Sequence, residues 1–108
     1  MTDVLKLVLT DHWFEEIKSG RKTHEYRLSK PFWDKRIGWI KDAFELKDID
    51  DEIYSDIFVP NVIFQKAYRK NPETMEFTIK NVRIIWGEHT DLKIKDFLYD
   101  IELGERLR

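Results

Sequence analysis

The sequence predicts a small α+β fold, a mostly antiparallel β-barrel of five to six strands with two short helices. The chain has 108 residues, enough for one compact domain and too few for two. The first half holds two stretches with apolar residues at helical spacing, whereas the second half alternates with the period of two typical of strands. Because strands cluster late in the chain, a parallel doubly wound sheet is disfavoured. We therefore expect a single domain over residues 1–108.

The first half is expected to alternate between strands and helices. The expected elements are a strand over 4–9, a helix over 11–19, a strand over 22–28 and a helix over 34–44. The first helix has an apolar stripe that includes Trp13 and Ile17, and Thr10 or Asp11 can cap its start. Gly20 follows it, where helices commonly end in the left-handed conformation.

The second half is expected to consist of strands and turns. The expected strands cover 62–68, 75–79, 82–86 and 97–103. Residues 71–73 read Asn-Pro-Glu, a turn signal, and residues 80–81 are expected to form a bulge. Gly104 is expected to end the last strand, and the acidic stretch 46–56 is expected to be a loop or a frayed helix end.

Composition excludes several classes of protein and site. The chain has no cysteine, which excludes disulfides, thiolate chemistry and Cys-based zinc sites. The three histidines lack metal-ligand spacing, and no nucleotide-loop or EF-hand pattern occurs, so we expect no metal and no cofactor. No apolar run approaches the roughly 20 residues of a membrane span, and residues 1–10 lack a signal-peptide pattern. These observations predict a cytoplasmic chain without a membrane partner.

Charge is distributed unevenly although the net charge is only −2. Residues 18–36 hold seven basic residues against two acidic ones, and residues 42–56 hold seven acidic residues against one lysine. Because the total charge does not attract polyanions, any nucleic-acid role depends on a local patch. The asymmetry predicts either one phosphate-facing side or ordinary solvated surface.

Residues 22–28 carry the most informative pattern. Alternation on the strand places Thr23, Glu25 and Arg27 on one face, and Lys22, His24, Tyr26 and Leu28 on the other. A buried strand face should be apolar, whereas the first of these faces carries an acid and a base two positions apart.

The stretch from Gly20 to Arg27 reads G-x-K-x-x-E-x-R and resembles the signature of the ASCH superfamily. The run over 14–23 is also typical of that family, and residues 67–72 and 101–104 resemble its later strands. The resemblance implies a PUA-like barrel with a cleft lined by Lys22, Glu25 and Arg27. It also implies RNA or a nucleoside as partner, because the family is described mostly as RNA-binding modules.

The three motif residues suit a nucleotide pocket chemically. Arg27 offers a planar fork of donors for a phosphate or a base edge. Glu25 can accept from an exocyclic amine, as acids do with cytosine. Lys22 can supply a charge to a phosphate or, if neutral, act as a base. The alternative interpretation is structural: Glu25 and Arg27 form an internal ion pair with Lys22 solvated nearby.

The resemblance leaves open whether the chain is an enzyme. A few small bacterial members are N4-acetylcytidine amidohydrolases, and others are described as ribonucleases. Those amidohydrolases carry a nucleophilic threonine where this chain has Glu25, and Thr23 lies about 7 Å away along the strand. If the chain is a hydrolase, Lys22 and Glu25 are the expected catalytic residues, with a water as nucleophile.

Further contacts to RNA are expected from aromatic and basic residues outside the motif. Trp33 is a candidate for the rim of the cleft, and Tyr68 is the best candidate for base stacking. Arg69 and Lys70 would extend the surface along the backbone of the nucleic acid. A third hypothesis is a protein-interaction domain that uses the acidic segment 42–56.

Overall fold

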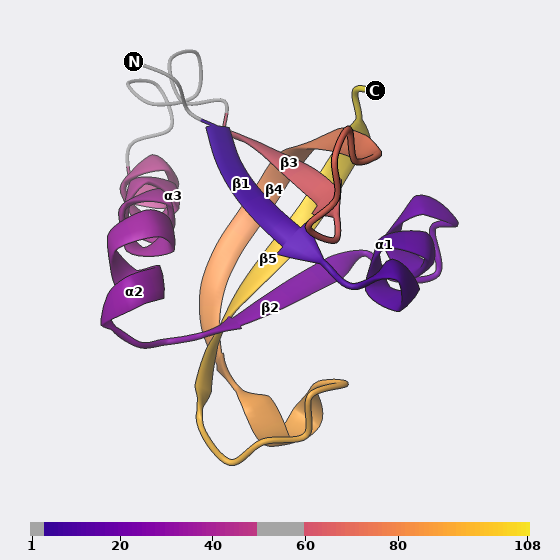
Figure 1. Ribbon diagram of the computed structural model, residues 1–108. Helices are drawn as coiled ribbons and strands as arrows, with labels where there is room; N and C mark the ends of the chain where they lie inside the picture. The colour runs from indigo at the N-terminus through magenta and orange to yellow at the C-terminus, as the bar shows by residue number, and fades with distance from the viewer. Residues whose placement is uncertain (1–3, 50–59) are drawn as a thin grey trace.

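The computed structural model describes residues 4–49 and 60–108 (Figure 1). Its elements are β1 (Val4–Leu9), α1 (Asp11–Lys18), β2 (His24–Leu28), α2 (Pro31–Trp33), the π-helix η1 (Asp34–Gly38), α3 (Trp39–Ile49), β3 (Asn61–Lys66), β4 (Thr74–Trp86), the 3₁₀ turn η2 (Gly87–His89) and β5 (Phe97–Arg106). Residues 50–56 of the acidic segment 42–56 lie outside the described residues. No helix in the described part of the chain is both long and apolar enough to cross a membrane.

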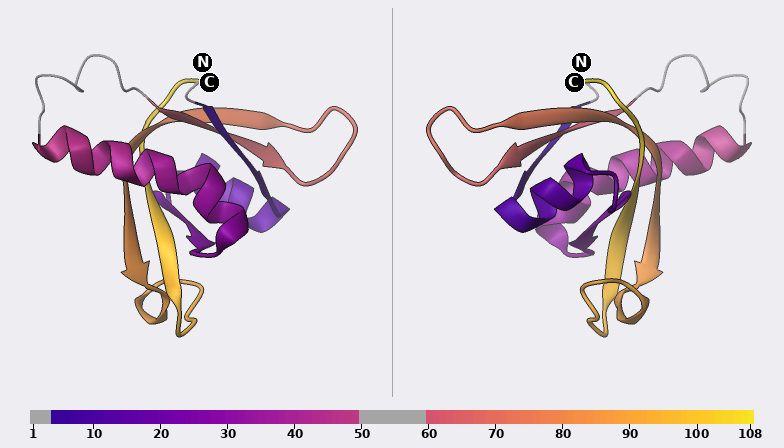
Figure 2. Two further views of the ribbon diagram at one scale, coloured as in Figure 1. Left: turned by 90° about the vertical axis from the view of Figure 1, so that its left-hand side faces the viewer. Right: turned by 90° about the vertical axis from the view of Figure 1, so that its right-hand side faces the viewer.

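A single curled sheet in the order β1-β3-β4-β5-β2 confirms the predicted α+β class. Three of its four pairings are antiparallel, whereas β1 and β3 run parallel, with Val4 beside Asn61 and Leu9 beside Lys66. β1 and β2 form the two edges and do not pair with each other, so the barrel is closed only in part. The turn between β3 and β4 and the loop between β4 and β5 project from the sheet in different directions (Figure 2).

The expected bulge lies in β4, which is one long strand. The register of β4 against β5 shifts on both sides of Ile79, so that Ile79 faces Leu103 while Asn81 faces Glu102. β5 continues to Arg106 rather than ending at Gly104. An added Cβ at Gly104 would stand 2.3 Å from the Thr78 hydroxyl oxygen, so this position needs glycine for close approach between strands.

Several expected boundaries were wrong. β3 stops at Lys66 rather than 68 because Ala67 turns into the left-handed region with φ 58°. Thr10 stands at the N-cap of α1, but its side chain makes no capping hydrogen bond. At the other end of α1, Gly20 has φ +84°, as its position after the helix predicts.

The second helix is longer than expected at both ends. It begins at Pro31, whose fixed φ suits the first helical position, and it runs through α2, η1 and α3 to Ile49. The helical stretch 31–49 therefore includes residues 46–49 of the stretch that was expected to be a loop or a frayed helix end. Ile37 and Ile40, two of the apolar positions that predicted this helix, are fully buried.

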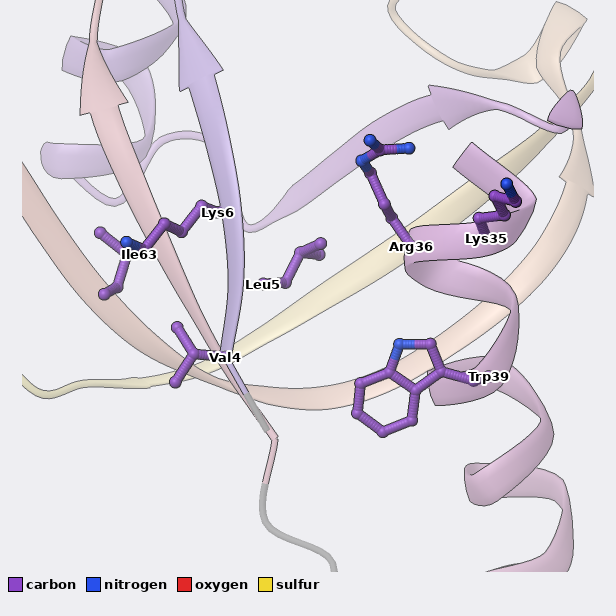
Figure 3. A pocket seen from close by; sticks show the side chains of 7 residues that line it. All are labelled: Val4, Leu5, Lys6, Lys35, Arg36, Trp39 and Ile63. Atoms are coloured by element: carbon purple, nitrogen blue, oxygen red, sulfur yellow. The ribbon is translucent and has the colours of Figure 1, made fainter. Parts of the chain in front are cut away.

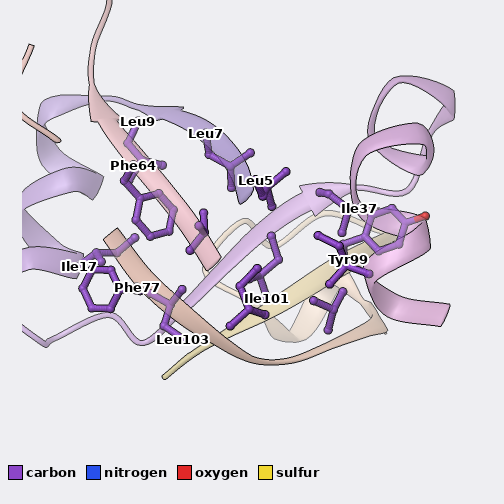
Figure 4. Close-up of a cluster of buried hydrophobic side chains, with 14 of the residues drawn as sticks. Leu5, Leu7, Leu9, Ile17, Ile37, Phe64, Phe77, Tyr99, Ile101 and Leu103 are labelled. Atoms are coloured by element: carbon purple, nitrogen blue, oxygen red, sulfur yellow. The ribbon is translucent and has the colours of Figure 1, made fainter. Parts of the chain in front are cut away.

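The core fills the inside of the curled sheet. It combines inward side chains of β1, β3, β4 and β5 with Phe14 and Ile17 of α1 and Ile37 and Ile40 of the helical stretch (Figure 4). In β1 the alternation is strict, with Leu5, Leu7 and Leu9 buried and the intervening residues more exposed. The two helical segments thus cover the sheet without closing the gap between β1 and β2.

Candidate functional site

The motif residues lie at the gap between the two edge strands. Arg27 on β2 donates a hydrogen bond from Nη2 to the Val8 carbonyl on β1, over 3.3 Å. A side chain, rather than a ladder of backbone hydrogen bonds, therefore joins β1 to β2. An edge strand leaves backbone groups unpaired, and here one of those carbonyls is satisfied by the guanidinium.

A small cavity of about 200 Å³ opens beside this bridge. It is lined by the end of β1, the start of α1, the motif strand and Leu92 from the loop before β5. Lys22, Glu25 and Arg27 all line it, as do the rings of Trp13 and Tyr26. The structure thus brings the three residues of the sequence motif into one concave site.

Glu25 is the buried centre of this site, with a side chain that is 9% exposed. Its Oε2 accepts a hydrogen bond from Arg27 Nη2 at 2.9 Å, and its Oε1 accepts one from the Tyr26 backbone N–H at 3.1 Å. Lys22 Nζ stands 3.8 Å from Oε1. Because a buried carboxylate is costly without partners, these contacts offset the cost of its burial and fix its orientation.

Lys22 is held on several sides rather than solvated. Its Nζ donates to Asp91 Oδ2 at 2.5 Å and lies 4.6 Å from the ring centre of Trp13 and 4.8 Å from that of Tyr26. Carboxylates and the faces of aromatic rings both attract a cation. The surroundings of Lys22 therefore favour a positively charged group that can meet an anion or an acceptor. The sequence offered no signal for Asp91, which lies in an irregular loop far along the chain.

Arg27 retains an unused donor. Its Nε is buried and has no hydrogen-bond partner among the described residues. Its guanidinium carbon lies 5.0 Å from the ring centre of Trp33, which does not itself line the cavity. A buried donor without a partner costs about 1–3 kcal/mol, which a ligand acceptor could recover.

Tyr68 and Arg69 lie apart from the cavity lining. Tyr68 is 89% exposed in the turn between β3 and β4. Arg69 forms an ion pair with Asp11, the first residue of α1, at 2.5 Å. Asp11 follows Thr10, which does line the cavity, so Arg69 is linked to the rim through α1.

The other face of β2 carries a second polar cluster. His24 Nδ1 lies 2.6 Å from Asp100 Oδ1, and Arg83 reaches the same carboxylate at 3.4 Å. Burial raises the pKa of Tyr26, and the nearby carboxylates of Asp100, Asp91 and Glu25 raise it further. Tyr26 therefore stays a neutral phenol near physiological pH. In residues 4–49 and 60–108, no three His, Cys, Asp or Glu side chains gather to hold a metal ion.

Comparisons with known proteins leave this site to be interpreted from its own geometry. No protein-family model, no curated protein and no solved structure matches the chain. The ASCH resemblance therefore rests on the sequence alone.

Proposed function

We propose that the chain is an ASCH-type domain with a PUA-like barrel that binds RNA or a nucleoside in the cleft of Lys22, Glu25 and Arg27. The observation that carries this proposal is the cavity at the gap between β1 and β2, where a buried carboxylate and an unsatisfied guanidinium donor meet. An ion pair that served stability alone would gain most from close packing around it. A hollow beside charged groups is instead the usual feature of a ligand site.

The size and chemistry of the cavity favour a single heterocyclic base. Pockets for drug-sized ligands measure about 300–1,000 Å³, so about 200 Å³ suits one ring system rather than a whole nucleotide. Glu25 offers an acceptor for an exocyclic amine, and Arg27 Nε offers a donor for a ring nitrogen or a carbonyl. The rings of Trp13 and Tyr26 supply apolar surface beside these polar groups.

Binding is tested by titrating the protein with cytidine, N4-acetylcytidine and a short single-stranded RNA while tryptophan fluorescence is followed. Arg27→Ala and Glu25→Gln should each weaken binding about 10- to 100-fold, because each leaves a buried polar group unpaired in the complex. Lys18→Ala is the matched control, since Lys18 pairs with Glu73 away from the cavity. Circular dichroism checks that each variant folds. If Arg27→Ala and Glu25→Gln bind these ligands like the wild type, the cavity is not the binding site.

Hydrolysis is the second candidate function, and the position of Glu25 is the observation that favours it. A carboxylate oriented by Arg27 and lining a cavity can take a proton from an attacking water. Thr23 does not line this cavity, so an acyl-enzyme route through its hydroxyl has no support here. Chromatography of the same titration mixtures distinguishes the two functions. Formation of cytidine from N4-acetylcytidine, or of cleaved RNA, would make the chain a hydrolase if that activity is absent from Glu25→Gln.

A further inference from the structure

The basic residues of the segment 18–36 fall into two groups in the structure. Those of the first group are each paired with a carboxylate: Lys18 with Glu73, Arg21 with Glu16, Lys22 with Asp91 and Arg27 with Glu25. Lys30, Lys35 and Arg36 form the second group. They are exposed, and no ion pair joins any of them to a carboxylate in the described part of the chain. Lys30, Lys35 and Arg36 therefore form a local patch of positive charge, without paired carboxylates, at the start of the helical stretch.

This patch borders a groove of about 660 Å³ between β1 and the helical stretch, here called the β1–α3 groove. Its lining includes Leu5 and Lys6 from β1, and Lys35, Arg36 and Trp39 from the helical side. Figure 3 shows the Trp39 ring extending from the helix toward β1, with Arg36 and Lys35 on the same helical stretch and Lys6 on the side of β1 away from the helix. The groove lining therefore combines an aromatic surface, 42% exposed at Trp39, with cations of the helical stretch and of β1.

A row of two aromatic rings with a cation at each end connects the small cavity with this groove. The guanidinium of Arg27 lies 5.0 Å from the ring centre of Trp33. Trp33 meets the ring of Phe32 edge to face, with centroids 4.8 Å apart. The guanidinium of Arg36 lies 3.7 Å from the centre of Phe32, which is 52% exposed. The row thus starts at the motif and ends at the bank of the β1–α3 groove.

The same edge strand borders both hollows. Val8 and Leu9 line the small cavity, and Val4 and Leu5 line the groove. Four residues of strand span about 13 Å, whereas a stacked single strand of nucleic acid advances about 3.4 Å per nucleotide. The distance between the two hollows therefore suits a strand of about four nucleotides.

We infer that the ligand is a single-stranded nucleic acid of several nucleotides rather than a free nucleoside. One base enters the small cavity, and the backbone follows the cation–aromatic row to the β1–α3 groove, where Lys35 and Arg36 meet phosphates. Aromatic rings beside cations are features by which proteins hold single strands, and Lys35 and Arg36 have no ion pair in the described part of the chain. The only acid in the row's helical segment 31–38, Asp34, is engaged by Tyr99 and Ser29. This inference rests on the proposed function.

The test compares two double variants that each remove two cations. Lys35→Ala/Arg36→Ala alters the groove, and Arg69→Ala/Lys70→Ala alters the turn between β3 and β4, the alternative path for a strand. Affinity for an 8-nucleotide single-stranded RNA and for cytidine is measured by fluorescence anisotropy and tryptophan quenching over a range of salt. The groove variant should bind the RNA at least 10-fold more weakly in low salt and should bind cytidine like the wild type.

Salt dependence gives a second readout. Loss of two phosphate contacts on a single strand should lower the slope of log affinity against log salt by about 1.4 in the groove variant only. Trp39→Phe should remove the part of the quenching that RNA causes and cytidine does not. Unchanged RNA affinity in the groove variant, or a loss of RNA affinity in the turn variant instead, would overturn the inference. That result would not contradict the proposed binding site in the small cavity. Absence of binding by the wild type to both ligands would remove the proposed function and the inference with it.

Discussion

Replacing Tyr99 with phenylalanine tests how the helical stretch is fastened to the sheet beside the candidate site. Tyr99 faces Arg27 across the β2–β5 pair, and its hydroxyl donates to Asp34 Oδ1 at 2.5 Å. The residue is buried, with 3% of its surface exposed. This hydrogen bond joins the start of η1 to β5. It therefore holds Trp33, the residue before Asp34, close to Arg27.

The structure gives the size and the pH window of the effect. Burial raises the pKa of Tyr99 from 10.0 to about 12, and the hydrogen bond and charge of Asp34 add to that shift. The unfolded chain therefore loses the phenol proton first, and stability falls as pH rises from about 10 to about 12. A shift of two units corresponds to about 2–3 kcal/mol of unfolding free energy. Below pH 10 the intact hydrogen bond to a carboxylate should contribute about 1–2 kcal/mol.

Urea unfolding followed by tryptophan fluorescence from pH 7 to 11.5 measures the contribution of the Tyr99 hydroxyl. It is the difference in unfolding free energy between the wild type and Tyr99→Phe. All other ionisable groups are present in both chains, so their contributions to the pH dependence largely cancel. The wild type should be more stable than Tyr99→Phe near neutral pH, and its advantage should shrink and disappear above pH 10. A difference that stays constant across that range would refute the assigned pKa shift and the hydrogen bond to Asp34.

Two further substitutions test the motif and the sheet. Glu25→Ala leaves Arg27 without its carboxylate and should lower the unfolding free energy by about 3 kcal/mol in urea, whereas a loss below 1 kcal/mol would mean that the pair is solvated. Gly104→Ala should cost about 1–3 kcal/mol because its Cβ would meet the Thr78 hydroxyl, and adding Thr78→Ala should recover part of that loss in thermal melts. If Thr78→Ala recovers no stability, the strain in Gly104→Ala does not come from the contact with the Thr78 hydroxyl.

Local patterns were enough to predict the elements that carry the site. Alternation over 22–28 placed Glu25 and Arg27 on one face and His24 on the other, and the contacts of Glu25 with Arg27 and of His24 with Asp100 agree. The expected place of Lys22 on the face of His24 was wrong, because Lys22 precedes β2 and its Nζ stands 3.8 Å from Glu25 Oε1. The glycine after α1 and the bulge near Lys80 also followed from local chemistry. Such features depend on neighbours within a few residues, which the sequence displays directly.

Features that depend on distant residues were not predictable in the same way. The pairing of Lys22 with Asp91 joins the segment before β2 to an irregular loop, where no periodicity in the sequence identifies Asp91 as the partner. The parallel pairing of β1 with β3 depends on how the chain returns after the helical stretch. The extension of α3 to Ile49 falls in an acidic stretch for which the sequence allowed either a loop or a frayed helix end. In each case tertiary contacts decided among conformations that local propensity left open.

The structural and functional interpretations of the motif need not compete. β1 and β2 do not pair, so the Val8 carbonyl needs a donor, and Arg27 supplies it while Glu25 holds the guanidinium. That arrangement uses Nη2 and leaves the buried Nε without a partner among the described residues, while the Arg27 side chain lines the cavity. A ligand that satisfied Nε would therefore strengthen the same bridge that closes the gap between the edge strands. On this reasoning ligand binding and stability are linked at Arg27, and a ligand that binds only the folded chain should raise its melting temperature with concentration.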